Sequence, residues 1–220
     1  MKSFMKRCWA HIHLDYLAQN LNHIRKLLPQ GTEVMAVVKA NAYGHGDGMI
    51  AAELQKQGVT WFCVSNVDEA ISLRKGGIKG EILILGTTPV ELAGLLVQYK
   101  LVQTVYSLEY AQQLSRELEK ENAVVECHFK IDTGMGRIGF LHHDTYNALE
   151  ELLKVCKLPG LKPTGIFTHY AVADEVSADS LAYTKKQLAA FQDIILKLKE
   201  NGVNLKTVHT KNSAGIERLG

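Results

Sequence analysis

Short apolar segments rich in β-branched residues alternate with amphipathic segments through almost the whole chain. The apolar segments have the length and composition of strands, whereas the segments between them repeat their apolar residues at helical spacing. We expect strands at residues 34–38, 61–64, 82–85, 102–105, 124–131, 164–168 and 207–209. We expect helices at residues 15–28, 47–57, 67–75, 89–98, 108–121, 145–157 and 180–201. Strands that alternate with helices in this way predict a parallel α/β sheet, either open and doubly wound or closed as a barrel.

Local signals mark several ends of these elements. Thr88 and Glu91 have the spacing of a capping box at the start of a helix. Gly58 and Gly202 stand where the end of a helix favours a left-handed residue. Before the first helix, residues 9–14 alternate between outward polar and inward apolar positions, so we expect a half-exposed strand there.

The composition excludes several classes of protein. The 220 residues are 46% apolar and 22% charged, which is typical of a globular domain, and a net charge of +2 without a basic cluster gives no case for nucleic acid. The longest apolar runs are of strand length, so we expect no membrane span, and the N-terminus lacks the apolar core of a signal peptide. The four cysteines are scattered without a Cys-x-x-Cys pair. We therefore expect reduced thiols in a cytoplasmic protein and no metal site.

The segment from Glu33 to His45 is the strongest candidate for chemistry. Lys39 directly follows the apolar run 34–38, and Tyr43 lies in the glycine-punctuated loop after it. A lysine at the carboxyl end of a buried parallel strand occupies the position where α/β barrels hold their active sites, and an imine-forming lysine suits it. The alternative is a lysine that ends a strand and extends its ammonium group into solvent.

Polar and glycine residues also follow the later strands. They are Lys130, Asp132 and Arg137 at the fifth strand, His169 at the sixth, and His209, Asn212 and Ser213 at the seventh. In a parallel sheet all of them gather on one rim. An imine-forming lysine, hydroxyls and backbone N–H groups for a phosphate, and an arginine for an anionic oxygen together describe a site for pyridoxal 5′-phosphate.

Each of these residues also has a simpler interpretation. Arg137 could pair with Asp132 and only brace the loop between them. His169 and His209 could be core histidines whose hydrogen bonds are satisfied. Ser213 could be no more than a helix cap. Their joint position on one rim favours the cofactor site over these separate explanations.

Four motifs in this order resemble those of the bacterial alanine racemases and the related serine racemases. They are Ala-Val-Val-Lys-Ala-Asn-Ala-Tyr-Gly-His-Gly, Lys-Ile-Asp-Thr-Gly-Met-Gly-Arg-Ile-Gly, Phe-Thr-His-Tyr-Ala-Val-Ala-Asp and His-Thr-Lys-Asn-Ser-Ala-Gly. The resemblance implies a TIM-type (β/α)₈ barrel that carries pyridoxal 5′-phosphate, a β-rich C-terminal domain, and a head-to-tail homodimer. It implies interconversion of L- and D-alanine, which supplies D-alanine for peptidoglycan.

The resemblance also implies a role for each matching residue. Lys39 would hold the cofactor as a Schiff base and act as the base for the D-enantiomer, and Arg137 would meet the cofactor's phenolic oxygen and the substrate. The remaining positions implied are Tyr43, Asn212 and Ser213 at the phosphate, His169 and His209 behind the pyridine ring, Leu85 in the pocket wall, and Lys130 as a carbamylated partner of Arg137.

The chain departs from the family in its length. Seven strands are expected where a barrel needs eight, and the family's second catalytic base is a tyrosine of the C-terminal domain, beyond Gly220. We therefore expect residues 1–14 to be the strand that pairs with that domain, residues 15–220 to be a barrel incomplete at its C-terminal end, and racemisation to be impaired. A serine racemase and a non-enzymatic barrel that binds pyridoxal phosphate stay open as alternatives.

Overall fold

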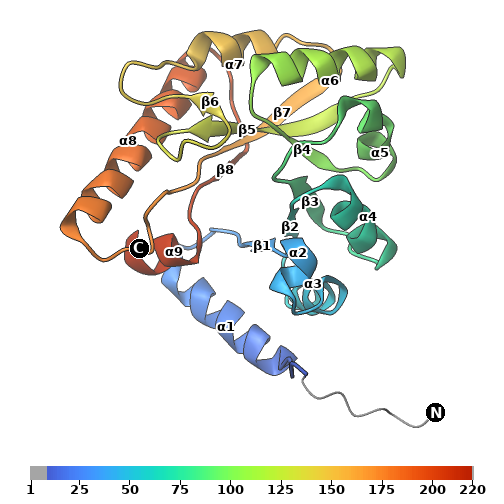
Figure 1. Ribbon diagram of the computed structural model, residues 1–220, viewed down its shortest axis with the longest axis vertical. Coiled ribbons are helices and arrows are strands. Elements are labelled where there is room, and N and C mark those ends of the chain that lie inside the picture. Colours follow the sequence, from blue (N-terminus) through green and yellow to red (C-terminus); the bar gives the residue numbers. More distant parts are fainter. Residues whose placement is uncertain (1–8, 220) are drawn as a thin grey trace.

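The computed structural model describes residues 9–219 as a curled parallel sheet with helices on its outer face (Figure 1). The strands are β1 (Met35–Val37), β2 (Trp61–Val64), β3 (Glu81–Ile84), β4 (Val102–Val105), β5 (Val125–Asp132), β6 (Phe140–Leu141), β7 (Leu161–Phe167) and β8 (Thr207–His209). The helices are α1 (Leu14–Leu27), α2 (Lys39–Tyr43), α3 (Asp47–Lys56), α4 (Val67–Lys75), η1 (Val90–Leu92), α5 (Ala93–Gln98), α6 (Leu108–Lys120), α7 (Leu149–Val155), α8 (Ala178–Glu200) and α9 (Ser213–Leu219).

The strands lie in the sheet in the order in which they occur in the chain, β1-β2-β3-β4-β5-β7-β8, and every pairing is parallel. The short β6 pairs only with the end of β5. This order with outer helices is that of a (β/α) barrel. Within residues 9–219, β1 and β8 are the two ends of the strand order, so the barrel is incomplete, as the sequence predicts.

Alternate residues of each strand face two apolar layers. Ile82 and Ile84 of β3 point outward and join the main core between the sheet and the helices. Leu83, between them, points inward and packs with Cys63 and Val102. Leu85 adds to this inner cluster just above the end of β3. The inside of the curled sheet is therefore packed near its middle, and polar groups are left for the rim.

The predicted strand at residues 9–14 is wrong for the part that the structure describes. Residues 9–13 have no regular structure, α1 already begins at Leu14, and residues 1–8 lie outside the described residues. A strand exists only through hydrogen bonds to a neighbouring strand, and no strand in residues 9–219 pairs with this segment. The pairing of this segment with a C-terminal domain, which the family resemblance implies, stays a prediction.

The predicted capping box at Thr88 and Glu91 is also wrong. Thr88 is buried, and its hydroxyl donates a hydrogen bond of 2.6 Å to Oε1 of Gln103 on the neighbouring strand. The chain therefore enters α5 through the short helix η1 without a side-chain cap. By contrast, Gly58 and Gly202 have φ angles of 81°, as expected for left-handed residues at helix ends.

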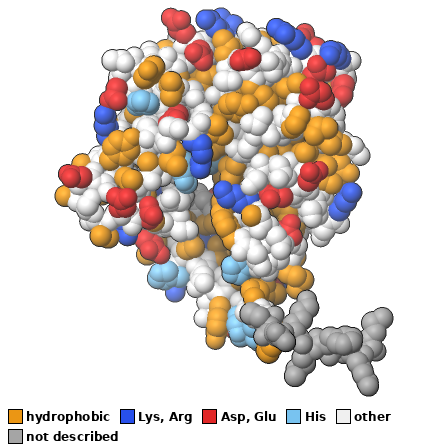
Figure 2. Space-filling model, viewed as in Figure 1, with side chains coloured by type: hydrophobic (Ala, Val, Ile, Leu, Met, Phe, Trp, Pro, Cys, Tyr) orange, Lys and Arg blue, Asp and Glu red, His pale blue; other side chains and the backbone are white. Residues whose placement is uncertain are grey.

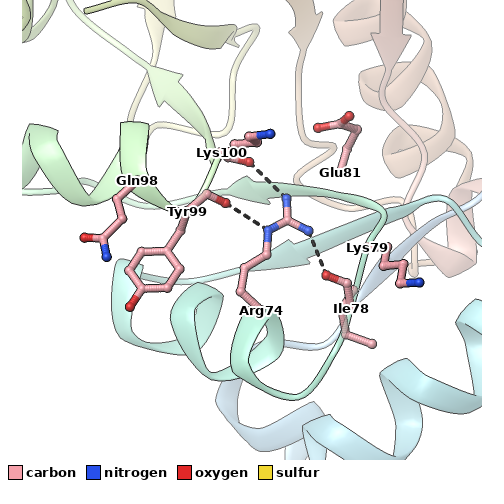
Figure 3. Close-up of a pocket in the computed structure, with 7 residues that line it drawn as sticks. All are labelled: Arg74, Ile78, Lys79, Glu81, Gln98, Tyr99 and Lys100. Atoms are coloured by element: carbon pink, nitrogen blue, oxygen red, sulfur yellow. Dashed lines mark hydrogen bonds between the residues drawn. The ribbon is translucent and has the colours of Figure 1, made fainter.

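Arg74 joins the amino-terminal ends of β3 and β4, at the edge of the sheet opposite the predicted site (Figure 3). Its guanidinium donates to the carbonyl oxygens of Ile78, Gly80, Tyr99 and Lys100 at 2.9, 2.5, 2.9 and 2.9 Å. A guanidinium that donates to four carbonyls holds together the segments that lead into β3 and β4. In the pocket of Figure 3, four of the five N–H donors of Arg74 are thus already bonded to backbone carbonyls, which gives this arginine a structural role.

Replacement of Arg74 by methionine should lower the free energy of unfolding by about 2–3 kcal/mol, because four carbonyls lose a charged donor. Urea denaturation with intrinsic fluorescence would measure the loss, and Lys75→Met, on the exposed face of the same helix, is the matched control. Equal midpoints for the two variants would contradict this structural role.

Candidate functional site at the carboxyl rim of the sheet

The predicted site residues all lie at the carboxyl ends of their strands. Lys39 and Tyr43 follow β1, Leu85 follows β3, Lys130 and Arg137 belong to the end of β5 and the loop after it, His169 follows β7, His209 ends β8, and Asn212 and Ser213 follow β8. Because the sheet is parallel, these ends form one rim. Figure 2 shows lysine or arginine and histidine side chains bordering a hollow in the face seen in Figure 1.

Four of these residues lie close enough for their charges to act on one another. The pKa of half-buried His169 is lowered first by burial and then by the positive charges of Lys130, Arg137 and Lys39. The pKa of Lys130 is lowered to about 8 by burial and by Arg137, against the opposing effect of Asp132. Side chains from three separate strand ends therefore bring positive charge to one site.

Lys130 is the most unusual of these groups. It is only 3% exposed, and its Nζ atom lies 5.0 Å from the centroid of the Phe167 ring. Within the described residues Nζ has no hydrogen-bond partner. A buried ammonium without an acceptor is costly, which favours the neutral amine and agrees with the lowered pKa of Lys130.

The loop that carries Arg137 is organised around Asp132. The Asp132 carboxylate accepts hydrogen bonds of 2.8–3.2 Å from the backbone N–H groups of Gly134, Met135, Gly136 and Arg137. Burial alone would raise the pKa of Asp132, but these four donors together lower it. The carboxylate thus braces the loop through its backbone, and the exposed Arg137 side chain is left for another anion.

His209 contacts a buried histidine that sequence reasoning missed, His128. Its Nε2 lies 3.0 Å from Nδ1 of His128, and its ring stacks on Phe167 at 4.7 Å. Burial lowers the pKa of His128 to about 4 and that of His209 to about 3, so both rings are neutral at pH 7. His128 precedes Lys130 by two residues in β5. Because alternate residues of a strand share a face, this spacing indicates that His128 lies on the same inward face as Lys130. A Cβ at Gly165 would come within 2.5 Å of the His128 ring, which explains the glycine there.

Helix α8 holds two rim loops, which the sequence also did not reveal. Gln187 is 1% exposed; its Oε1 accepts from the N–H of Ala171 at 3.0 Å and its Nε2 donates to the carbonyl of His169 at 3.2 Å. One turn earlier, the hydroxyl of Tyr183 donates to the carbonyl of Gly134 at 2.6 Å. The backbone beside His169 and the loop of Arg137 are therefore fixed to one helix.

The segment after Lys39 has an uncommon backbone. Ala40, Asn41, Ala42 and Tyr43 are consecutive left-handed residues with φ angles of 51°, 56°, 49° and 55°. Each such non-glycine residue costs about 1–2 kcal/mol, so this turn persists only because its surroundings hold it. The Tyr43 side chain at its end is 61% exposed.

Asn212, rather than Ser213, caps helix α9. Its Oδ1 accepts from the N–H of Gly215 at 2.8 Å, which is the hydrogen bond of an N-cap residue. The interpretation of Ser213 as a mere cap is therefore wrong. Ser213 is exposed at the first helical position, and its hydroxyl lies at the surface of the rim.

Known proteins resemble this chain in both sequence and fold. Residues 12–219 match the family described as alanine racemase, N-terminal domain. The chain belongs to the alanine racemase family. It is 40% identical over 219 residues to an alanine racemase of Clostridium novyi and 42% identical over 216 residues to that of Clostridium tetani, covering 100% and 98% of this chain. It superimposes on the alanine racemase of Clostridium difficile, solved in complex with cycloserine, with a TM-score of 0.85 at 40% identity over 92% of this chain.

The chain spans about half the length of the alanine racemases it matches, 55%, 54% and 54% of those three chains. Within residues 9–219, no helix is long and apolar enough to cross a membrane. The same residues contain no group of three or more side chains suited to hold a metal ion. Cys63, Cys127 and Cys156 are free thiols.

Proposed function

We propose that this chain forms the cofactor-binding barrel of an alanine racemase, which interconverts L- and D-alanine with pyridoxal 5′-phosphate. The observation that carries the proposal is the cationic rim at which Lys39, Lys130, Arg137 and His169 are electrostatically coupled. Family membership supports the same reaction. A small amino acid is the expected substrate; serine in place of alanine is the alternative within the family.

The residues present fit pyridoxal phosphate. The cofactor brings a phosphate and a phenolic oxygen, both of which are anionic. The rim carries positively charged side chains that can bind these groups, and the carboxylate of Asp132 is already bonded to the backbone of its own loop. Lys39 would hold the cofactor covalently and Arg137 would donate to its phenolic oxygen. Tyr43 and Ser213 are both exposed on this rim, and their hydroxyls would donate hydrogen bonds to the phosphate, with Asn212 beside them.

When bound, the cofactor supplies an electron sink for the pair left on Cα when its proton departs. The amine of Lys39 would remove that proton from Cα of the D-enantiomer, or return it, as a general base. Arg137 would orient the substrate carboxylate. The neutral pair His128 and His209, with His169, would form the wall of the site behind the ring and add no charge there.

Lys130 would hold Arg137 as a carbamate. Carbon dioxide adds to the neutral amine, forming an N–C bond while one N–H proton leaves to water, and the pKa of about 8 leaves an appreciable neutral fraction at physiological pH. The carbamate would convert the buried cation without an acceptor into an anion that accepts from the guanidinium. This change would remove the repulsion between the positive charges of Lys130 and Arg137.

The second base would be a tyrosine of the partner subunit in a head-to-tail homodimer of the whole protein, as the family resemblance implies. The whole protein would act in the cytoplasm and supply D-alanine for peptidoglycan. Residues 1–220 include Lys39 but not that tyrosine. We therefore expect this polypeptide alone to exchange the Cα proton on the Lys39 face and not on the opposite face.

For the polypeptide of 220 residues with pyridoxal phosphate in D₂O, we expect deuterium to enter Cα of D-alanine and not of L-alanine. Loss of one base of a pair costs about 10²–10⁴-fold, so exchange on the Lys39 face should dominate. Mass spectrometry of each enantiomer would measure incorporation against time.

Free pyridoxal phosphate without protein is the control, since it has no chirality and exchanges both enantiomers at the same rate. Equal incorporation from both enantiomers with the protein would refute one-sided exchange. Cofactor binding without exchange of either enantiomer would instead indicate the non-enzymatic barrel.

A further inference from the structure

The left-handed turn Ala40–Tyr43 sets the spacing between the two predicted site residues that follow β1. Lys39 immediately precedes it and Tyr43 is its last residue. Because a left-handed run of non-glycine residues is unfavourable by itself, the directions of both side chains depend on whatever holds this backbone. The contacts of the turn therefore decide how the site is presented.

Glu69 makes the side-chain contact that reaches the start of this turn. One carboxylate oxygen accepts from the N–H of Ala40 at 2.9 Å, and the other accepts from the N–H of Ser65 at 2.7 Å. Ser65 directly follows β2, the strand that pairs with β1. The carboxylate thus joins the backbone after Lys39 to the end of the neighbouring strand.

Glu69 is itself held in place. It lies in the first turn of α4, and its backbone N–H donates to Oδ1 of the N-cap residue Asn66 at 3.0 Å. Helix α4 lies beside α2 and packs on β2 and β3 (Figure 1). A side chain anchored on a packed helix can impose a position on the turn, whereas one on a free loop could only follow it.

We propose that Glu69 is a positioning residue, which sets the left-handed turn and thereby the placement of Lys39 and Tyr43 on the rim. Its effect on the cofactor rests on the proposed function, but its hold on the backbone does not. Glutamate is required because both contacts need an acceptor. Glutamine would present an amide N–H group to one of the two backbone N–H groups, and aspartate is one methylene shorter.

The test compares Glu69→Gln with Asp68→Asn, its exposed neighbour in the same helical turn. Hydrogen exchange of the 220-residue chain without cofactor should accelerate by about tenfold or more at residues 40–46 and 65 in E69Q, and not elsewhere. Labelling of Lys39 by pyridoxal phosphate and borohydride should become several-fold slower in E69Q, while D68N behaves as the wild type in both measurements.

Two results would overturn the proposal. Acceleration spread evenly over the chain would mean that Glu69 contributes only to global stability, and local acceleration with unchanged labelling would mean that the turn does not place Lys39. If E69Q does not unfold cooperatively, Glu69→Asp, which keeps the charge, takes its place with the same expected results. If the wild type itself does not label, the proposed function fails, whereas the exchange measurement still decides the role of Glu69.

Discussion

Replacement of Lys39 by alanine should abolish labelling of the chain by pyridoxal phosphate and borohydride and reduce Cα exchange of D-alanine by about 10²–10⁴-fold or more. In the proposed function this amine is both the group that holds the cofactor and the base for the D-enantiomer, so its removal should eliminate both roles. Peptide mapping after reduction should find the pyridoxyl group on Lys39 in the wild type. Exchange followed by mass spectrometry gives the second measurement.

The control for this prediction is Lys75→Ala, which removes an exposed lysine from the last turn of helix α4, next to Arg74 and the amino-terminal end of β3. It should label and exchange as the wild type does. A pyridoxyl group on any other lysine with Lys39 unmodified, or full exchange by the Lys39→Ala variant, would contradict the assignment of the site. Circular dichroism of both variants would establish that they are folded equally well.

The position of Lys39 was predictable because the signals that define it are local. The apolar run before it and the alternation of strands and helices are visible in a single sequence, and a parallel sheet places every carboxyl end on one rim. The strands Trp61–Val64, Val102–Val105 and Thr207–His209 have the bounds that the pattern predicts. A regular fold thus converts chain order into spatial proximity.

The residues that support the site were not predictable, because their contacts depend on tertiary packing. In the sequence Gln187 is one of several polar residues in a long helix. In the structure it is buried, and its side chain forms hydrogen bonds with the backbone of His169 and Ala171. The His128–His209 contact joins residues that are 81 positions apart in the sequence. The left-handed turn at Ala40–Tyr43 contains only one of the residue types that favour such angles, Asn41, so propensity did not reveal it.

Asp132 is expected to produce the largest effect of the supporting residues. Its replacement by asparagine should lower the free energy of unfolding by about 2–4 kcal/mol at pH 7, because an ionised acceptor of four backbone N–H groups is replaced by an amide with one acceptor atom. Asp174→Asn, an exposed carboxylate on the loop after β7, is the control. The loosened loop should also raise the KM for D-alanine, because it carries Arg137.

The pH dependence gives the sharper test of Asp132. Its pKa in the folded chain lies below the ordinary value of 3.8, so the unfolded chain binds a proton first and acid favours unfolding. The stabilisation is therefore fully present above the unfolded-state pKa and is lost as the pH falls through the folded-state pKa. The difference in unfolding free energy between wild type and D132N should stay constant from pH 7 to about 5 and shrink below pH 4. Since both proteins share every other carboxylate, a difference that persists unchanged at pH 3 would show that the loop does not depend on the ionised form of Asp132.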